Sequence, residues 1–232
     1  MPTNPESIQV WVVCLSDHTC EAWRPLLTDS EWAKAMRFRM PADQRRCAVT
    51  RGVLKALLSR YLDLPATEIV FTENQFGKPA IASQALQFNV SHSGDYCVLA
   101  FAQESPLGVD VEQIRSQRVV DELAQRVLSP AEYARFMALP DADRKQTFFE
   151  IWTLKESVLK GIGSGLSVAP ECLEISFFPD SPKLLSADTE LIPDVGEWTL
   201  HSLSIGHPDY AAAIAVKQKA PSIKLDHYRY YV

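Results

Sequence analysis

Several features that would place a protein in a class at once are missing from this chain. It has no run of about 18 or more apolar residues, so no segment is long enough for a membrane-spanning helix. Only 9 of its 232 residues are glycine and no Gly-X-Y repeat is present, which excludes a collagen-like protein. The Gly-x-Ser-x-Gly pattern of serine hydrolases, the phosphate-binding P-loop and any zinc-binding histidine spacing are also absent.

The sequence has no cysteine pattern of a secreted or zinc-binding protein. Its 5 cysteines are far apart and form no Cys-x-x-Cys pair. The N-terminus lacks the basic stretch followed by an apolar stretch that marks a secretory signal peptide. Free thiols without export are typical of a cytoplasmic protein, which is the location we expect.

The composition is that of a folded globular protein, but the charge is unevenly distributed. Hydrophobic residues make up 47% and the net charge is −6. Residues 34–60 nevertheless contain eight basic residues and one acid, a net charge of +7. Such a local basic field favours a bound anion, although a solvated helix face explains it equally well. Nucleic acid is disfavoured, because the whole chain is acidic and aromatics do not alternate with the basic residues.

Strands and helices alternate along the chain without a strict β–α–β rhythm, which predicts an α+β fold with helices on antiparallel sheet. A capping box, Ser129 to Glu132, marks one helix start clearly. The predicted strands are 8–14, 69–71, 86–90, 96–101, 107–112, 173–178, 198–203 and 210–216, and the predicted helices are 41–62, 119–128, 130–139 and 143–160.

Two acids stand two residues apart on a predicted strand. Side chains alternate along a strand, so Asp110 and Glu112 share one face, with Cα atoms about 6.5–7 Å apart. Two carboxylates at that spacing repel each other unless a cation lies between them, and such a pair suits Mg²⁺. A strand whose second face is simply in contact with water is the alternative.

A second group of charges lies on the predicted helix 143–160. Glu156 and Lys160 stand one turn apart, which in an exposed helix is an ordinary ion pair. The residues around them are mostly apolar, however, including Phe148, Trp152 and Leu154. A helix this apolar is buried on most sides, so we expect its few charges to face a cleft or a partner.

Two predicted turns carry groups that can bind phosphate. In Phe88–Gly94, the predicted hairpin tip 91–95 offers serine hydroxyls, His92 and backbone N–H groups. The turn Gly77-Lys78-Pro79 carries one lysine. Each of them alone is also compatible with a plain turn.

Taken together and in this order, these motifs resemble the 4′-phosphopantetheinyl transferases of the surfactin-synthetase-activating type, from about Lys34 to about Leu166. The resemblance implies two similar α/β subdomains related by a pseudo-twofold, at about residues 1–104 and 105–232, with the active site in the cleft between them. It also implies a monomer, since one chain supplies both halves of the cleft.

The resemblance further implies the reaction. Enzymes of this family move the phosphopantetheine arm of coenzyme A onto a serine of an acyl or peptidyl carrier protein, and release adenosine 3′,5′-bisphosphate with the help of Mg²⁺. Two alternatives stay open, namely another Mg²⁺-dependent nucleotide or pyrophosphate enzyme, and a non-catalytic module that binds carrier proteins. No membrane and no nucleic acid is expected among the partners.

The site residues implied by the resemblance come from both halves. Asp110, Glu112 and Glu156 match the metal-binding acids, and Glu156 with Lys160 is the expected catalytic pair, although the sequence leaves open whether Glu156 is mainly ligand or base. Glu31 departs from the family, which often has a lysine there. The expected coenzyme A contacts are Lys34, Arg46, Gly77, Lys78, Ser91, His92, Lys155 and Lys160.

Carrier proteins are usually acidic, and so is this chain. Docking therefore requires a locally basic or apolar patch, for which Arg135, Arg144 and Lys145 are the predicted candidates.

Overall fold

A computed structural model describes residues 7–74, 77–81, 86–115, 120–163, 168–177 and 179–229. The strands are β1 (Ser7–Cys14), β2 (Phe71–Glu73), β3 (Pro79–Ile81), β4 (Gln87–Ser93), β5 (Tyr96–Ala102), β6 (Leu107–Gln113), β7 (Glu174–Ser176), β8 (Lys183–Ser186), β9 (Thr199–Ser202), β10 (Tyr210–Val216) and β11 (Ser222–His227). The helices are α1 (Cys20–Trp23), α2 (Asp29–Met36), α3 (Pro41–Leu62), α4 (Val120–Val127), α5 (Pro130–Met137) and α6 (Asp141–Ile162).

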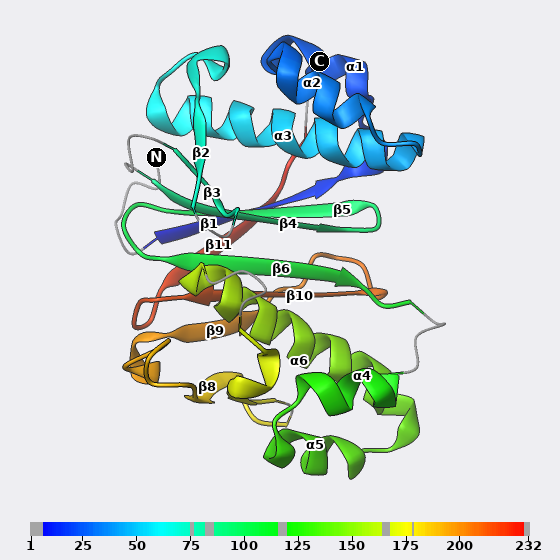
Figure 1. Ribbon diagram of the computed structural model, residues 1–232, viewed down its shortest axis with the longest axis vertical. Coiled ribbons are helices and arrows are strands. Elements are labelled where there is room, and N and C mark those ends of the chain that lie inside the picture. The colour runs from blue at the N-terminus through cyan, green and yellow to red at the C-terminus, as the bar shows by residue number, and fades with distance from the viewer. Residues whose placement is uncertain are drawn as a thin grey trace.

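Two sheets form the middle of the molecule, and each is covered on its outer face by one long helix (Figure 1). The first sheet has the strand order β11-β1-β5-β4 and the second has the order β6-β10-β9. Helix α3 lies over the first sheet and α6 lies over the second, and each of these helices has 22 residues. The two halves thus share one plan, and the predicted α+β fold is confirmed.

Three layers of apolar side chains hold these elements together. Between the sheets, side chains of β1, β5, β6 and β10 form one cluster that includes Val10, Val98, Val109 and Ile214. These residues are fully buried, which is the usual main source of stability in a domain. The sheets are therefore fixed face to face.

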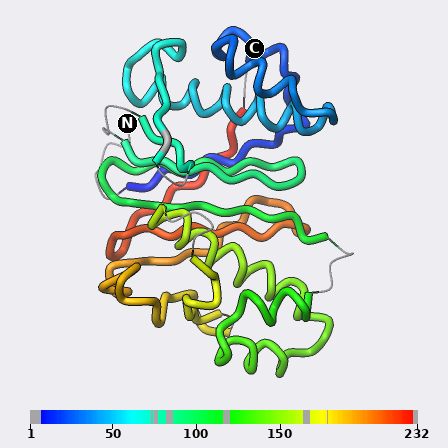
Figure 2. The backbone as a smooth tube through the Cα atoms, viewed as in Figure 1, coloured from blue at the N-terminus to red at the C-terminus, as the bar shows by residue number. Residues whose placement is uncertain are grey.

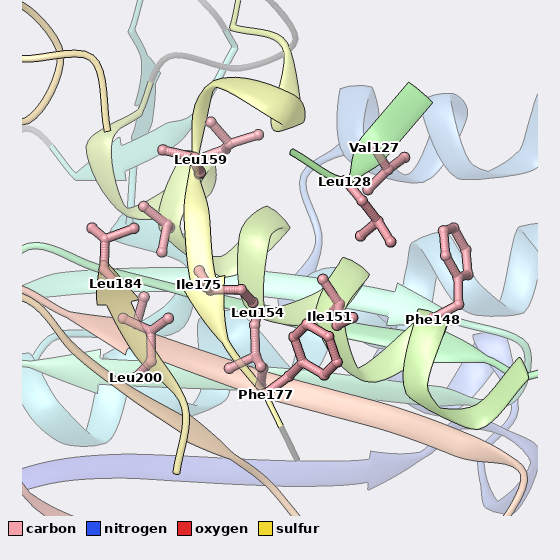
Figure 3. Close-up of a cluster of buried hydrophobic side chains, with 14 of the residues drawn as sticks. Val127, Leu128, Phe148, Ile151, Leu154, Leu159, Ile175, Phe177, Leu184 and Leu200 are labelled. Atoms are coloured by element: carbon pink, nitrogen blue, oxygen red, sulfur yellow. The ribbon is translucent and has the colours of Figure 1, made fainter. Parts of the chain in front are cut away.

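The outer layer under α6 is the most apolar part of the chain. Leu154 of this helix lies beside Ile175 and Phe177, and Phe148 lies on the side of Val127 and Leu128, all within one buried cluster (Figure 3). The helix is buried on most sides, as its sequence predicts, so its charged residues are confined to a few directions.

The predicted elements agree with the structure where hydrophobic periodicity is strong. The helix predicted over 41–62 is α3, and it ends at Asp63, which adopts a left-handed conformation with φ 55°. The helix predicted over 143–160 lies within α6, and the strand predicted over 210–216 is β10. Val119, Leu166 and Phe178, which were included in predicted segments, lie outside the described residues.

One predicted turn is wrong. The residues from Ser91 to Ser93 were expected at a hairpin tip, but they continue β4 and pair with Tyr96–Val98 of β5. The turn between the strands is only Gly94-Asp95, which is a common length for a hairpin loop. Ser91 and His92 are thus held by a sheet rather than by a loop.

The C-terminal strand is a feature that the sequence analysis missed. Strand β11 runs parallel to β1 at the edge of the first sheet, with Ser7 opposite Ser222 and Val12 opposite His227. Figure 2 shows this red segment returning beside the blue β1. The chain therefore crosses back after the second sheet, while the boundary at 104/105 stays a prediction. None of the helices in the described ranges is long and apolar enough to cross a membrane.

Candidate active site

A basic cavity of about 390 Å³ opens between α2, α3 and β4. Lys34, Arg46 and His92, all predicted from the sequence, line it together with Arg51 and Glu31. Burial lowers the pKa of His92, and the nearby charges of Arg46 and Lys160 lower it further. A concentration of cations around a cavity of this size is suited to a phosphorylated ligand.

Glu31 stands where the family often has lysine, and the structure shows how its charge is balanced. Its Oε2 lies 3.1 Å from the fully buried Lys55 Nζ, and its Oε1 lies 3.6 Å from Arg51 Nε. Burial acts to raise the pKa of Glu31, but the Thr28 backbone N–H and Lys55 hold it below the usual value. The carboxylate is therefore ionised and matched by two cations, so Glu31 does not stand in the cavity as an uncompensated negative charge.

Arg51 is the residue of this cavity that the sequence analysis did not single out. Its guanidinium lies 4.2 Å from the centre of the Phe71 ring. Its Nη1 is buried and has no hydrogen-bond partner among the residues described. A buried, unpaired guanidinium nitrogen is unfavourable in the absence of an anion, and it points to one as the ligand.

An acidic cavity of about 360 Å³ adjoins the basic one, and both are lined by Val90 and His92. It is also lined by the predicted residues Ser91, Asp110, Glu112, Glu156 and Lys160, and by Trp152. Strand β6 supplies the first two acids, and helix α6 supplies the third acid and the lysine.

Close contact between β6 and α6 brings these residues together. Gly108 makes the approach possible, because a Cβ atom there would lie 2.1 Å from the Ser157 carbonyl oxygen. Lys160 Nζ is 2.6 Å from Asp110 Oδ1 across this contact. Burial raises the pKa of Glu156, and the charges of Asp110 and Glu112 raise it further. Glu156 is thus a carboxylate with an increased affinity for protons.

The acids of this cavity fit a divalent cation. Asp110 is buried, and its Oδ2 has no hydrogen-bond partner within the described ranges. An ionised oxygen left in this way is unfavourable, and a cation would satisfy it. No three acidic, histidine or cysteine side chains in the described part of the chain are gathered tightly enough to form a complete metal-binding group. Asp110, Glu112 and Glu156 thus line one cavity, but their carboxylates are not gathered closely enough to surround a single ion.

Lys78 lies between the two halves, beside Gly77 and Lys160 at a smaller cavity of about 200 Å³. Its Nζ donates hydrogen bonds to the backbone carbonyls of Lys160 at 2.7 Å, Leu107 at 3.1 Å and Gly161 at 3.3 Å. These bonds bind the turn to the C-terminal end of α6 and to the start of β6. The side chain of Lys78 thus fixes the position of the backbone at Lys160.

Lys78 predicts a pH dependence of stability. Burial lowers its pKa from 10.5 to about 8. Between these values the unfolded chain binds more protons than the folded one, so this group makes stability rise with pH from about 8 to about 10.5. We therefore expect the difference in the free energy of unfolding between wild type and Lys78→Met, measured in urea, to increase in favour of wild type as the pH rises from about 8 to about 10.5. Parallel pH profiles of the two proteins would contradict this role.

The structure does not bring Lys155 to the cavities, in contrast to the prediction. This side chain is fully buried on the other side of α6, where its Nζ lies 2.5 Å from Glu132 Oε2. It also donates to the backbone carbonyls of Val127 at 2.9 Å and Leu173 at 2.8 Å. On a helix, neighbouring residues point about 100° apart, so Lys155 and Glu156 cannot both face the cleft.

Two of the three predicted docking residues are also engaged inside the chain. Arg144 donates to the carbonyls of Met137 at 2.8 Å and Leu139 at 3.2 Å, where it ends helix α5. Arg135 pairs with Asp180 at 3.0 Å. These cations stabilise local structure, whereas Lys145 makes no ion pair or side-chain hydrogen bond with the residues that the structure describes.

The two adjoining cavities thus place cations on one side and carboxylates on the other, which is an arrangement suited to a phosphorylated ligand and a divalent cation. Comparison with known proteins agrees. Residues 106–215 match the model of the 4′-phosphopantetheinyl transferase superfamily, and residues 15–104 match that of the 4′-phosphopantetheinyl transferase N-terminal region.

Individual proteins are similar to this chain. The 4′-phosphopantetheinyl transferase HetI of Nostoc is 35% identical over 177 residues, which cover 72% of this chain and 74% of HetI. The enzyme AcpT of Salmonella typhimurium is 34% identical, covering 65% of this chain and 80% of AcpT. A crystal structure of the Bacillus anthracis holo-(acyl-carrier-protein) synthase in complex with CoA is similar, with 22% identity, a TM-score of 0.38, and 48% of this chain and 93% of that chain covered.

The chain belongs to the 4′-phosphopantetheinyl transferase superfamily, and the resemblance predicted from its motifs is confirmed.

Proposed function

We propose that this protein transfers the phosphopantetheine arm of coenzyme A to a serine of an apo acyl or peptidyl carrier protein, with Mg²⁺, and releases adenosine 3′,5′-bisphosphate. The observation that carries the proposal is the junction of the two cavities at Val90 and His92. One ligand can place a phosphorylated nucleoside among the cations and a pyrophosphate among the acids. Coenzyme A has this layout.

The nucleotide end of coenzyme A would lie in the basic cavity. Lys34, Arg46, Arg51 and His92 line it, and the unpaired Nη1 of Arg51 is the nitrogen best prepared for a phosphate oxygen. An arginine fork matches phosphate geometry and keeps its charge at every physiological pH. We assign Arg51 to the 3′-phosphate.

The acids would hold the metal. Asp110, Glu112 and Glu156 line the adjoining cavity, and Mg²⁺ favours sites with a few carboxylates and substrate phosphates. When bound, the ion would polarise the pyrophosphate.

The chain's own residues then account for the proton and the leaving group. The serine oxygen of the carrier forms a bond to the β-phosphorus of coenzyme A, and the bond from that phosphorus to the bridging oxygen breaks. Glu156, whose pKa is raised by burial and by the neighbouring acids, accepts the serine proton. Lys160 lies in the same cavity and stabilises the charge that develops on the leaving bisphosphate.

Intact-mass spectrometry tests this function directly. An apo acyl carrier protein incubated with coenzyme A, Mg²⁺ and this protein should gain the mass of one phosphopantetheine, and EDTA should prevent the gain. If several fatty-acid and peptidyl carriers stayed unmodified, the non-catalytic alternative would take its place.

We further propose a cytoplasmic monomer, since all five cysteines are free thiols and one chain lines both cavities.

The assignment of Arg51 predicts a specific change in ligand preference. Arg51→Gln should weaken the binding of coenzyme A about 10- to 100-fold, because it removes a hydrogen bond between charged groups. It should barely change the binding of dephospho-coenzyme A, which lacks the 3′-phosphate. Calorimetry in EDTA measures both. Arg60→Gln, an exposed arginine of the same helix, is the matched control. An equal loss for both ligands would place Arg51 elsewhere than at the 3′-phosphate.

A further inference from the structure

The two sheets meet at β4 and β6, which lie side by side but belong to different sheets (Figure 1). Side chains, rather than backbone carbonyls, join them. Three side chains of β4 accept hydrogen bonds from backbone N–H groups of β6 at 2.9–3.3 Å: Asn89 from Val109, Ser91 from Val111 and Ser93 from Gln113. Since the pairs advance together along both strands, β4 and β6 run parallel. We call this set of three side chains, Asn89, Ser91 and Ser93, the seam.

The two serines of the seam also hold the two acids of β6. Ser91 Oγ donates to Asp110 Oδ1 at 2.8 Å, and Ser93 Oγ donates to Glu112 Oε2 at 2.7 Å. Each serine thus binds β6 twice, once at a backbone N–H and once at the carboxylate of the preceding residue. The alternate spacing of the serines matches the alternate spacing of the acids, because both strands have a period of two.

The hydroxyl of Ser91 has no capacity left for another ligand. A serine hydroxyl offers one donor and two acceptor positions. Its hydrogen goes to Asp110, and its two lone pairs accept from the Val111 N–H and from Lys160 Nζ at 2.8 Å. The residue is also only 6% exposed. A phosphate of coenzyme A could bind this hydroxyl only after the bond to Asp110 had broken.

We infer that Ser91 and Ser93 are positioning residues that orient Asp110 and Glu112 for the metal, and that the Ser91 hydroxyl is not the nucleotide contact that the family resemblance implies for this residue. This inference rests on the proposed function. With Oδ1 of Asp110 held by Ser91 and Lys160, its unpaired Oδ2 is the oxygen left for the ion. The seam also fixes the acidic half of the cleft to β4, the strand that carries His92 of the basic half.

Removal of the Ser91 hydroxyl should therefore act on the metal and not on the nucleotide. In Ser91→Ala, we expect the Mg²⁺ concentration for half-maximal transfer to rise about 10- to 100-fold, the usual effect of losing a partner of a metal ligand. The binding of Mn²⁺ in the presence of coenzyme A, followed by the electron paramagnetic resonance of the free ion, should weaken by the same factor. Metal-free binding of coenzyme A in EDTA should change less than about twofold.

Three variants complete the experiment. Ser91→Thr keeps the hydroxyl and should restore Mn²⁺ binding, and Ser93→Ala should weaken it through Glu112. Ser105→Ala is the matched control, because its hydroxyl bonds to Gln218 at 2.9 Å and lies outside both cavities. If Ser91→Ala does not fold, Ser93→Ala decides the question by the same two measurements.

The outcomes separate this inference from the proposed function. Weaker metal-free binding of coenzyme A with unchanged Mn²⁺ binding would overturn it and make Ser91 a nucleotide contact. If the wild-type protein modified no carrier but Ser91→Ala still weakened Mn²⁺ binding, the positioning role of the seam would be supported while the proposed transferase function would fail.

Discussion

Replacing Asp110 with asparagine is expected to reduce phosphopantetheine transfer by about 10³-fold or more, while the protein stays folded. The amide can still accept the hydrogen bonds of Ser91 and Lys160 through one oxygen, so the local structure is kept. Its NH₂ group then replaces the unpaired Oδ2 and presents hydrogens to the place where a cation would lie. Loss of one group that stabilises the transition state electrostatically typically lowers kcat by about 10²–10³-fold, and loss of a direct metal ligand lowers the rate further.

The same variant should not weaken metal-free binding of coenzyme A. A negative charge has been removed next to the site proposed for the pyrophosphate, so affinity measured in EDTA should stay equal or increase. Asp226→Asn is the matched control, since this aspartate lies on the edge strand β11 and pairs with Lys224 at 3.1 Å, away from both cavities. Full transfer activity in Asp110→Asn would remove this residue from the metal site.

Sequence patterns within a few residues predicted the helices and strands that depend mainly on interactions between residues close in the chain. Helices α3 and α6 and strand β10 follow directly from hydrophobic periodicity and end signals. Helix α2 was missed, although Thr28 and Glu31 form the same kind of capping box as the one that was used at Ser129.

Long-range pairing could not be predicted in the same way. Strand β11 is short and only partly buried, and its partner β1 lies more than 200 residues earlier in the chain. Nothing in its own sequence specifies a parallel neighbour at that distance. The seam has the same origin. The alternation of Asn89, Ser91 and Ser93 becomes meaningful only when β6 lies beside β4, and without that neighbour these residues are typical of a polar turn.

Most of the site residues that the motifs predicted line the two adjoining cavities, but a position within a motif does not specify the direction of a side chain. Lys34, Arg46 and His92 line the basic cavity, and Asp110, Glu112, Glu156 and Lys160 line the acidic one. Lys155 was included because it lies within the same motif, yet it points away from the cleft. Arg51 was counted only as one charge of a basic segment, because its unpaired nitrogen is visible only in the folded protein.

Lys155 should instead produce the largest loss of stability among these residues. Its ammonium group and the Glu132 carboxylate are both buried, and Glu132 also accepts the backbone N–H groups of Ser129 and Ile175, each at 2.7 Å. Lys155→Met would leave this carboxylate without its cation. Breaking a buried ion pair from one side typically costs about 3–5 kcal/mol, which for a chain of this length lowers Tm by about 10 °C.

A second substitution should recover part of this loss. In Lys155→Met combined with Glu132→Gln, both charges are gone, and the glutamine oxygen can still accept the Ile175 N–H. Urea unfolding of wild type, both single variants and the double variant gives the coupling energy of the pair. Lys160→Met, five residues further along α6, is the contrasting variant, because its partner Asp110 lies in the acidic cavity and the loss of Lys160 should reduce transfer far more than stability. If Lys155→Met weakened coenzyme A binding without lowering stability, Lys155 would belong to the cleft and not to the buried ion pair.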